Sequence, residues 1–101
     1  MRPRAGTVLV LPFLLLACAC GGETAAHHHR YLWAQKCAMC HSLEASQPSP
    51  NPRAANLARV RPSVEQVRRA VIDGRAGMPK GLLGGADVDE IAAYVAEVTR
   101  R

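Results

Sequence analysis

Three segments of the chain carry apolar residues at the spacing of an α-helix, and none shows the alternating pattern of a β-strand. The first segment covers residues 28–40 and places Leu32, Trp33 and Cys37 in helical register. The pattern predicts an all-α protein.

The second segment follows Pro62. Ser63 is followed three residues later by Gln66, the spacing of a capping box at a helix start, and the segment stops at Gly74. Its apolar stripe consists of Val64, Val67, Val71 and Ile72. We therefore predict a helix between Ser63 and Gly74.

The third segment begins at Asp87, and Glu90 three residues on predicts another capping box. Its buried face is expected to consist of Val88, Ile91, Ala92, Val95 and Val98. The connections between segments are long, because residues 42–62 hold four prolines and residues 77–85 hold four glycines and one proline. Such loops fit a compact domain only if they wrap a large apolar group that serves as its core.

The N-terminal apolar run has the profile of a signal peptide, which we place at residues 1–17. The run is shorter than the roughly 20 residues that span a bilayer. Its end, LLAC at residues 15–18, resembles a bacterial lipobox, which implies lipidation of Cys18 and a membrane-anchored protein facing the periplasm or the outside. The letters ACA at residues 17–19 also fit ordinary secretion of a soluble chain. Residues 18–26 are expected to form a flexible tether.

The remaining domain, residues 27–101, is small for a protein stabilised by an apolar core alone. The chain has four cysteines, but Cys18 and Cys20 lie at the processing site. Only Cys37 and Cys40 are left for the domain, so a disulfide framework is excluded. A bound metal or large ligand is expected instead.

The motif CAMCH, residues 37–41, is the C-x-x-C-H signature of haem c attachment. Two thiols three residues apart on one helical turn can add to two vinyl groups of one porphyrin, and His41 is then placed as the proximal iron ligand. A structural zinc site needs four ligands, and the chain offers Cys37, Cys40 and His41 without a second C-x-x-C motif. A thioredoxin-type dithiol would need a βαβ context, which is absent from the pattern.

A second axial ligand is expected from one of three methionines. Met1 is the initiator, and Met39 is held between the two attachment cysteines. Met78 lies in a glycine-rich stretch and is followed by Pro79, which stiffens the backbone. Met78 is therefore the predicted sixth ligand, with a gap-filling core methionine as the alternative.

These features together resemble a class I monohaem c-type cytochrome of the small bacterial type, over residues 30–98. The resemblance rests on Leu32-Trp33, the CAMCH motif, Asn56-Leu57, Gly74-Arg75 leading to Met78-Pro79, and Ile91-Ala92-Ala93-Tyr94-Val95. It implies a cytochrome c fold, with three main helices and irregular loops around one covalently bound haem c. It also implies that the first and last helices cross and pack through Trp33 and Tyr94.

The sequence departs from that family at two positions. His29 stands where a small residue is common at the helix crossing, and Ala55 replaces a common proline. The carbonyl of that residue accepts a hydrogen bond from the proximal imidazole in the family, and Ala55 can supply it equally well. The histidine triplet at residues 27–29 is interpreted as a solvated helix start in the linker, because consecutive helical residues face different directions.

His/Met ligation leaves no open iron position, so the expected function is one-electron transfer rather than enzymatic catalysis. The predicted partners are a terminal oxidase, a reductase or an exported dehydrogenase, without nucleic acid or small-molecule substrate. The alternative is a haem-based gas or peroxide sensor, or a peroxidase-like protein, with a labile methionine. Without Arg2 and Arg4 the net charge is +3, and a weak basic collar for an acidic partner is expected from Arg53, Arg59, Arg61 and Lys80.

Overall fold

A computed structural model describes residues 3–6, 12 and 21–101 of the chain. It contains four helices: α1 (Gly21–Lys36), α2 (Leu57–Val60), α3 (Val64–Asp73) and α4 (Ala86–Arg100). The described residues form no strand and only two isolated bridges, Ser42 with Asn56 and Arg75 with Met78. The predicted all-α class is confirmed.

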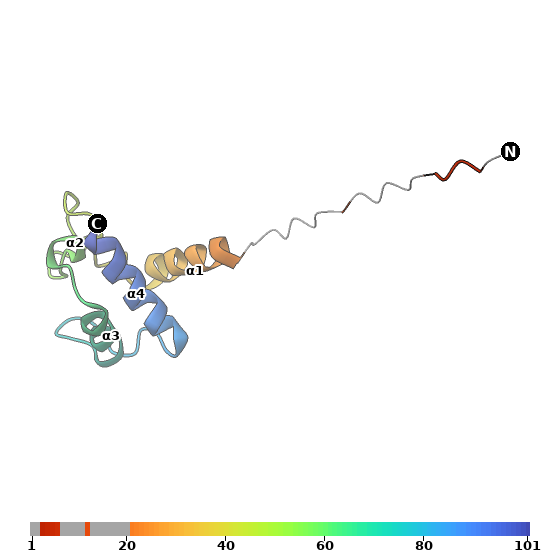
Figure 1. Ribbon diagram of the computed structural model, residues 1–101. Helices are drawn as coiled ribbons and strands as arrows, with labels where there is room; N and C mark the ends of the chain where they lie inside the picture. Colours follow the sequence, from red (N-terminus) through yellow and green to blue (C-terminus); the bar gives the residue numbers. More distant parts are fainter. Residues whose placement is uncertain (1–2, 7–11, 13–20) are drawn as a thin grey trace.

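Helix α4 is the centre of the fold and packs against each of the other three helices (Figure 1). Its buried residues are Val88, Ile91, Ala92, Val95, Ala96 and Thr99. Val98, predicted to be buried, is only partly so. The hydroxyl of buried Thr99 is satisfied within the helix, where it donates to the Val95 carbonyl oxygen at 2.8 Å.

The start of α3 is the predicted capping box. The Ser63 hydroxyl accepts from the Gln66 amide at 3.1 Å, and the Gln66 side chain accepts from the Ser63 amide at 2.8 Å. The helix ends at Gly74, as expected. Its buried stripe is narrower than predicted, because Val71 is buried whereas Val64 and Ile72 are exposed.

The capping box predicted for α4 is wrong. The N-cap residue is Gly85, at a φ of 57°, and no side chain caps the helix. Asp87 lies inside the first turn, and its carboxylate pairs with His28 of α1 at 3.0 Å. A contact across 59 residues therefore replaces the local one that the spacing indicated.

Helix α1 begins and ends earlier than predicted. It includes residues 21–26, which were expected to form a flexible tether, and stops at Lys36 instead of Cys40. The histidine triplet lies within α1, where His27 and His28 are exposed, so the interpretation as a solvated helix start fits them, whereas the interpretation as linker does not. His28 and His29 lie within α1 and contact Glu90 of α4, and the His29 ring stacks on Tyr94 with centroids 5.8 Å apart.

The connection between residues 42 and 62 is more ordered than its prolines indicated. It contains the short helix α2, whose N-cap is Asn56. Arg61 is the C-cap of α2 and adopts a left-handed φ of 52°. The Arg61 guanidinium donates to the carbonyl oxygens of Thr99 and Arg100, both at 3.0 Å. These bonds cap the C-terminus of α4, where a positive charge is favourable.

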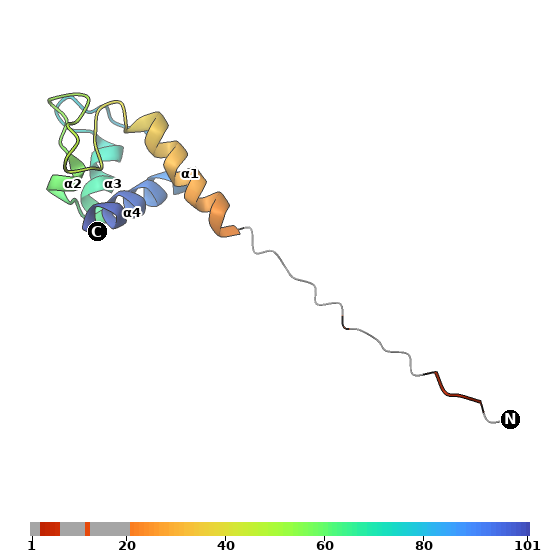
Figure 2. The ribbon, with the colours of Figure 1, turned by 90° about the horizontal axis from the view of Figure 1, so that it is seen from above.

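The two long loops and the C-terminal end of α1 lie on the same side of α4 (Figure 2). Partly buried apolar residues from these segments pack against the buried cluster of Leu32, Val71, Val88, Ile91 and Val95. This side of the molecule therefore brings together the segments in which the cofactor ligands were predicted.

Candidate cofactor site

Cys37 and Cys40 lie on one backbone turn that continues α1. The Cys40 amide donates to the Cys37 carbonyl oxygen at 3.1 Å, and the His41 amide donates to the same oxygen at 2.9 Å. Both cysteines are free thiols. The turn presents two thiols three residues apart and an imidazole directly after them, which is the donor set that haem c attachment requires.

The two thiols differ in their surroundings. Cys37 packs against the buried core cluster, whereas Cys40 is exposed. Burial, together with the nearby Cys40, raises the pKa of the Cys37 thiol to about 11. A half-buried thiol with a raised pKa is protonated at neutral pH, so Cys37 is not by itself an activated thiolate.

The imidazole of His41 is fixed by one short hydrogen bond. Its Nδ1 lies 2.7 Å from the carbonyl oxygen of Ala55. A carbonyl oxygen can only accept, so Nδ1 carries the proton and Nε2 is left with its lone pair. This is the orientation and tautomer of a metal-binding histidine whose second nitrogen is held by the protein.

Asn56 holds the loop that supplies the Ala55 carbonyl. Its amide nitrogen donates to the carbonyl oxygens of Glu44 at 2.9 Å and Gln47 at 2.8 Å. Its side-chain oxygen accepts from the Arg59 amide at 3.2 Å. The Leu57 amide also donates to the Ser42 carbonyl oxygen at 2.9 Å, so the residue after His41 is joined directly to the segment that follows Ala55.

Met78 lies on a tight turn after α3. Its amide donates to the Arg75 carbonyl oxygen at 2.8 Å, and its carbonyl oxygen accepts from the Arg75 amide at 3.1 Å. Gly74 begins this turn at a φ of 72°, and a Cβ there would lie 2.8 Å from the Met78 carbonyl oxygen. The close approach explains why glycine is needed before the methionine.

The structure brings Cys37 and Met78 against the same buried cluster, although they are far apart in the sequence. Cys40 and His41 follow Cys37 on its turn, whereas Cys18 lies outside the described residues. The hydrogen bonds made by the side chains of Asn56 and Arg61 were not predicted from the sequence. Asn56 was noted as part of the Asn-Leu pair in the family resemblance. Its side-chain hydrogen bonds, however, join two segments that no local sequence pattern connects.

Only two of the four residues of the predicted basic collar have side chains that are not engaged in hydrogen bonds with the described residues. The Arg59 guanidinium donates to the Ala45 carbonyl oxygen at 3.0 Å, and Arg61 caps α4. Both therefore hold loops in place. Arg53 and Lys80 are exposed and make no ion pair with any described residue.

The helices around α4, the turn with two thiols and the oriented imidazole define a c-type cytochrome. The family described as cytochrome c oxidase, cbb3-type, subunit III matches residues 24–95, and the chain belongs to it. Searches of curated proteins and of solved structures gave no significant match.

Membership of this family establishes the cytochrome c fold and covalently bound haem c as the cofactor. It also establishes electron transfer through haem as the kind of function. The residues present fit this cofactor, because His41 keeps Nε2 available and Cys37 and Cys40 lie on one turn directly before it. None of the helices in the described part of the chain is long and apolar enough to cross a membrane.

Proposed function

We propose that the protein is a one-electron carrier whose haem c is attached to Cys37 and Cys40 and whose iron is bound by His41 and Met78. The observation that carries this proposal is the 2.7 Å hydrogen bond from His41 Nδ1 to the Ala55 carbonyl oxygen. It holds the imidazole in the tautomer that leaves Nε2 for iron. When bound, haem c supplies a reversible one-electron couple at its iron.

Met78 is supported as the second ligand by its position. It is half-buried, packs against the same apolar cluster as Cys37 and is held by two backbone hydrogen bonds to Arg75. Met39 is 79% exposed and lies between the two cysteines, so it remains a solvent-facing residue. A thioether ligand from Met78 raises the reduction potential and leaves no iron position open for a substrate.

We also propose that the electron acceptor is a terminal oxidase. The family description names a subunit of such an enzyme, and a carrier of this kind needs a partner surface near its own haem. Arg53 and Lys80 are exposed, and they belong to the two long loops that lie with the C-terminal end of α1 on one side of α4 (Figure 2). We therefore expect them to face an acidic partner. Replacing both by glutamine should slow reduction of the oxidase most strongly at low ionic strength, because salt screens such attraction.

For location, we propose that the chain is exported and anchored through a lipid on Cys18. The support is the LLAC sequence at residues 15–18, which lies outside the described residues. The variant Cys18→Ala should move the protein from the membrane fraction to the soluble fraction. If the variant is instead processed and distributed as the native chain is, ordinary secretion is the correct interpretation.

The axial ligands are tested with the haem-loaded protein and two matched variants. The native oxidised protein should show the sulfur-to-iron charge-transfer band, and its reduced form should not bind carbon monoxide readily at neutral pH. Met78→Ala should lose the band and gain carbon monoxide binding, whereas Met39→Ala should change neither. Ready carbon monoxide binding by the native protein would instead favour a sensor or peroxidase-like function.

A further inference from the structure

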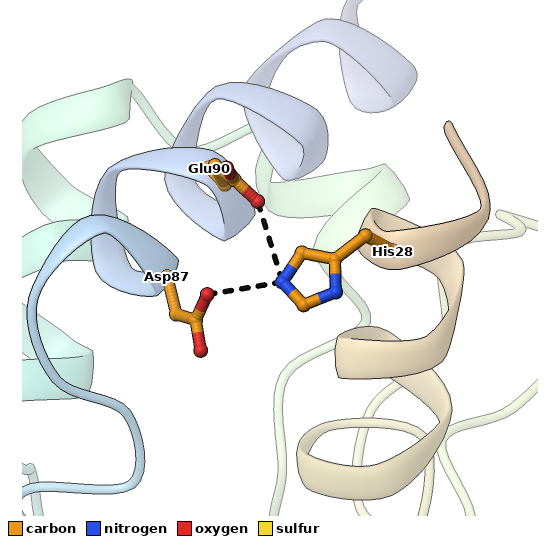
Figure 3. Close-up of side chains that lie close together, drawn as sticks. All are labelled: His28, Asp87 and Glu90. Atoms are coloured by element: carbon orange, nitrogen blue, oxygen red, sulfur yellow. Dashed lines mark hydrogen bonds and ion pairs between the residues drawn. The ribbon is translucent and has the colours of Figure 1, made fainter. Parts of the chain in front are cut away.

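Three side chains that could bind a metal meet where α1 crosses the start of α4 (Figure 3). The His28 Nε2 atom on α1 lies 3.0 Å from Asp87 Oδ1 and 3.5 Å from Glu90 Oε2 on α4. The three atoms all lie within 4.8 Å of one another. Asp87 and Glu90 share a face because they are three residues apart on the helix.

We propose that His28, Asp87 and Glu90 bind a divalent transition-metal ion of the Zn²⁺ type, which joins α1 to α4. Zinc binds imidazole nitrogen and carboxylate oxygen at about 2.0–2.2 Å in tetrahedral geometry, so its ligand atoms lie roughly 3.3–3.6 Å apart. The two distances from His28 are close to that value. The metal takes the place of the Nε2 proton, and water completes the coordination.

The donor set selects the class of ion. One imidazole and two carboxylates suit zinc and its neighbours in the first transition series. Calcium needs six to eight oxygen ligands, and magnesium needs octahedral oxygen coordination, which this group does not offer. Two carboxylates with a neutral imidazole carry two negative charges, which a divalent ion neutralises.

An independent observation comes from one carboxylate oxygen of Glu90. Glu90 Oε2 is shielded from solvent and has no hydrogen-bond partner among the described residues. Besides the 3.5 Å to His28, it lies 3.7 Å from the Nε2 atom of His29. Glu90 Oε2 therefore has two imidazole nitrogens nearby but no hydrogen bond, and a cation between these groups would supply a bond to it.

The site is separate from the haem-attachment motif. His28 lies nine residues before Cys37, which is about 13 Å along the axis of a helix. Stacking of His29 on Tyr94 holds the same part of α1 against α4. The side chains of His28, Asp87 and Glu90 are 45, 41 and 42% exposed, so an ion can reach them without unfolding of the domain.

The test is titration of the chelator-treated, haem-loaded protein with zinc chloride at neutral pH, followed by calorimetry and thermal unfolding. One equivalent of zinc should bind, and a hundredfold excess over the dissociation constant should raise the midpoint of unfolding by on the order of 10 °C. X-ray absorption at the zinc edge, which is distinct from the iron edge, should show a mixed nitrogen and oxygen environment.

Three variants identify the ligands. His28→Ala and Glu90→Gln should each lose this equivalent and the thermal shift, and the haem spectrum serves as the check on folding. His27→Ala is the matched control: it removes an exposed imidazole one residue away that makes no ion pair with the described residues, and it should bind as the native chain does. Absence of binding, or equal binding by all three variants, would overturn the proposal.

Discussion

His41 and Ala55 are joined by a hydrogen bond of 2.7 Å across 14 residues of sequence. The bond links the turn that holds the two cysteines to the loop that covers it. The imidazole orientation depends on the position of a backbone carbonyl, and that carbonyl depends on the loop around Asn56. The stability of this loop and the orientation of the His41 imidazole are thus coupled.

The variant Ala55→Pro should keep this hydrogen bond, because proline retains its carbonyl oxygen. The Ala55 amide makes no backbone hydrogen bond with the described residues, so none is lost. Reduced freedom of the unfolded chain should raise the free energy of unfolding by about 0.4–1 kcal/mol. Urea unfolding of the haem-loaded protein measures the change, with Ala55→Gly as a control expected to lower it. A loss of stability in the proline variant would show that the native backbone at residue 55 is incompatible with proline.

The variant Asn56→Ala should lower the free energy of unfolding by about 2–3 kcal/mol, because three hydrogen bonds, one of them the N-cap bond of α2, are removed together. Asn51→Ala is the matched control. Asn51 accepts a single bond from the Arg53 amide, at 3.0 Å, so its replacement should have an effect of about 1 kcal/mol or less. Equal effects in urea unfolding would contradict the assigned role of Asn56.

The variant Gly74→Ala should displace the backbone of the turn that holds Met78. Its Cβ would lie 2.8 Å from the Met78 carbonyl oxygen and 2.9 Å from the Lys80 amide, in addition to the strain of a positive φ. Gly77 has a φ of 80° but open space around it, so Gly77→Ala isolates the backbone strain, roughly 1–2 kcal/mol. Gly74→Ala should be less stable by about 1–3 kcal/mol beyond that, because the turn must move.

The spectrum of these two variants provides the second measurement. If Met78 binds the iron, Gly74→Ala should weaken the sulfur-to-iron charge-transfer band, whereas Gly77→Ala should keep it. Loss of stability in Gly74→Ala with an unchanged band would show that the turn can move without moving the thioether.

Local patterns predicted the parts of the fold that local interactions determine. The Ser63 and Gln66 capping box and the end of α3 at Gly74 follow from neighbouring residues, and both are present. The C-x-x-C-H motif identified the cofactor because its chemistry needs only five consecutive residues. Ala55 was identified as a hydrogen-bond acceptor through a family resemblance rather than through any pattern around it.

Long-range contacts account for what the sequence did not show. Asp87 has the spacing of an N-cap, yet its carboxylate pairs with His28, 59 residues away. The four-residue helix α2 is too short to give a periodic signal, and Asn56 holds it through carbonyl groups of another segment. Arg61 likewise donates hydrogen bonds to carbonyl oxygens at the C-terminus of α4. No sequence pattern near residue 61 indicates this contact.

The pair between His28 and Asp87 should make stability depend on pH. The hydrogen bond to Asp87 raises the pKa of His28 above its usual 6.5, with partial opposition from desolvation. A raised pKa in the folded state means that the stabilising effect is fully present below about pH 6.5 and is lost as the pH rises through the folded-state value. The stability difference between the native chain and His28→Gln should therefore be larger at pH 5.5 than at pH 9.

Urea unfolding at low ionic strength, with a chelator present, measures this difference. The chelator matters because a bound metal needs the deprotonated imidazole, so zinc would add its stabilisation at the higher pH instead. His27→Gln is the control and should show the same difference from the native chain at both values. If His28→Gln also shows no change between pH 5.5 and pH 9, the ion pair with Asp87 does not contribute to folding.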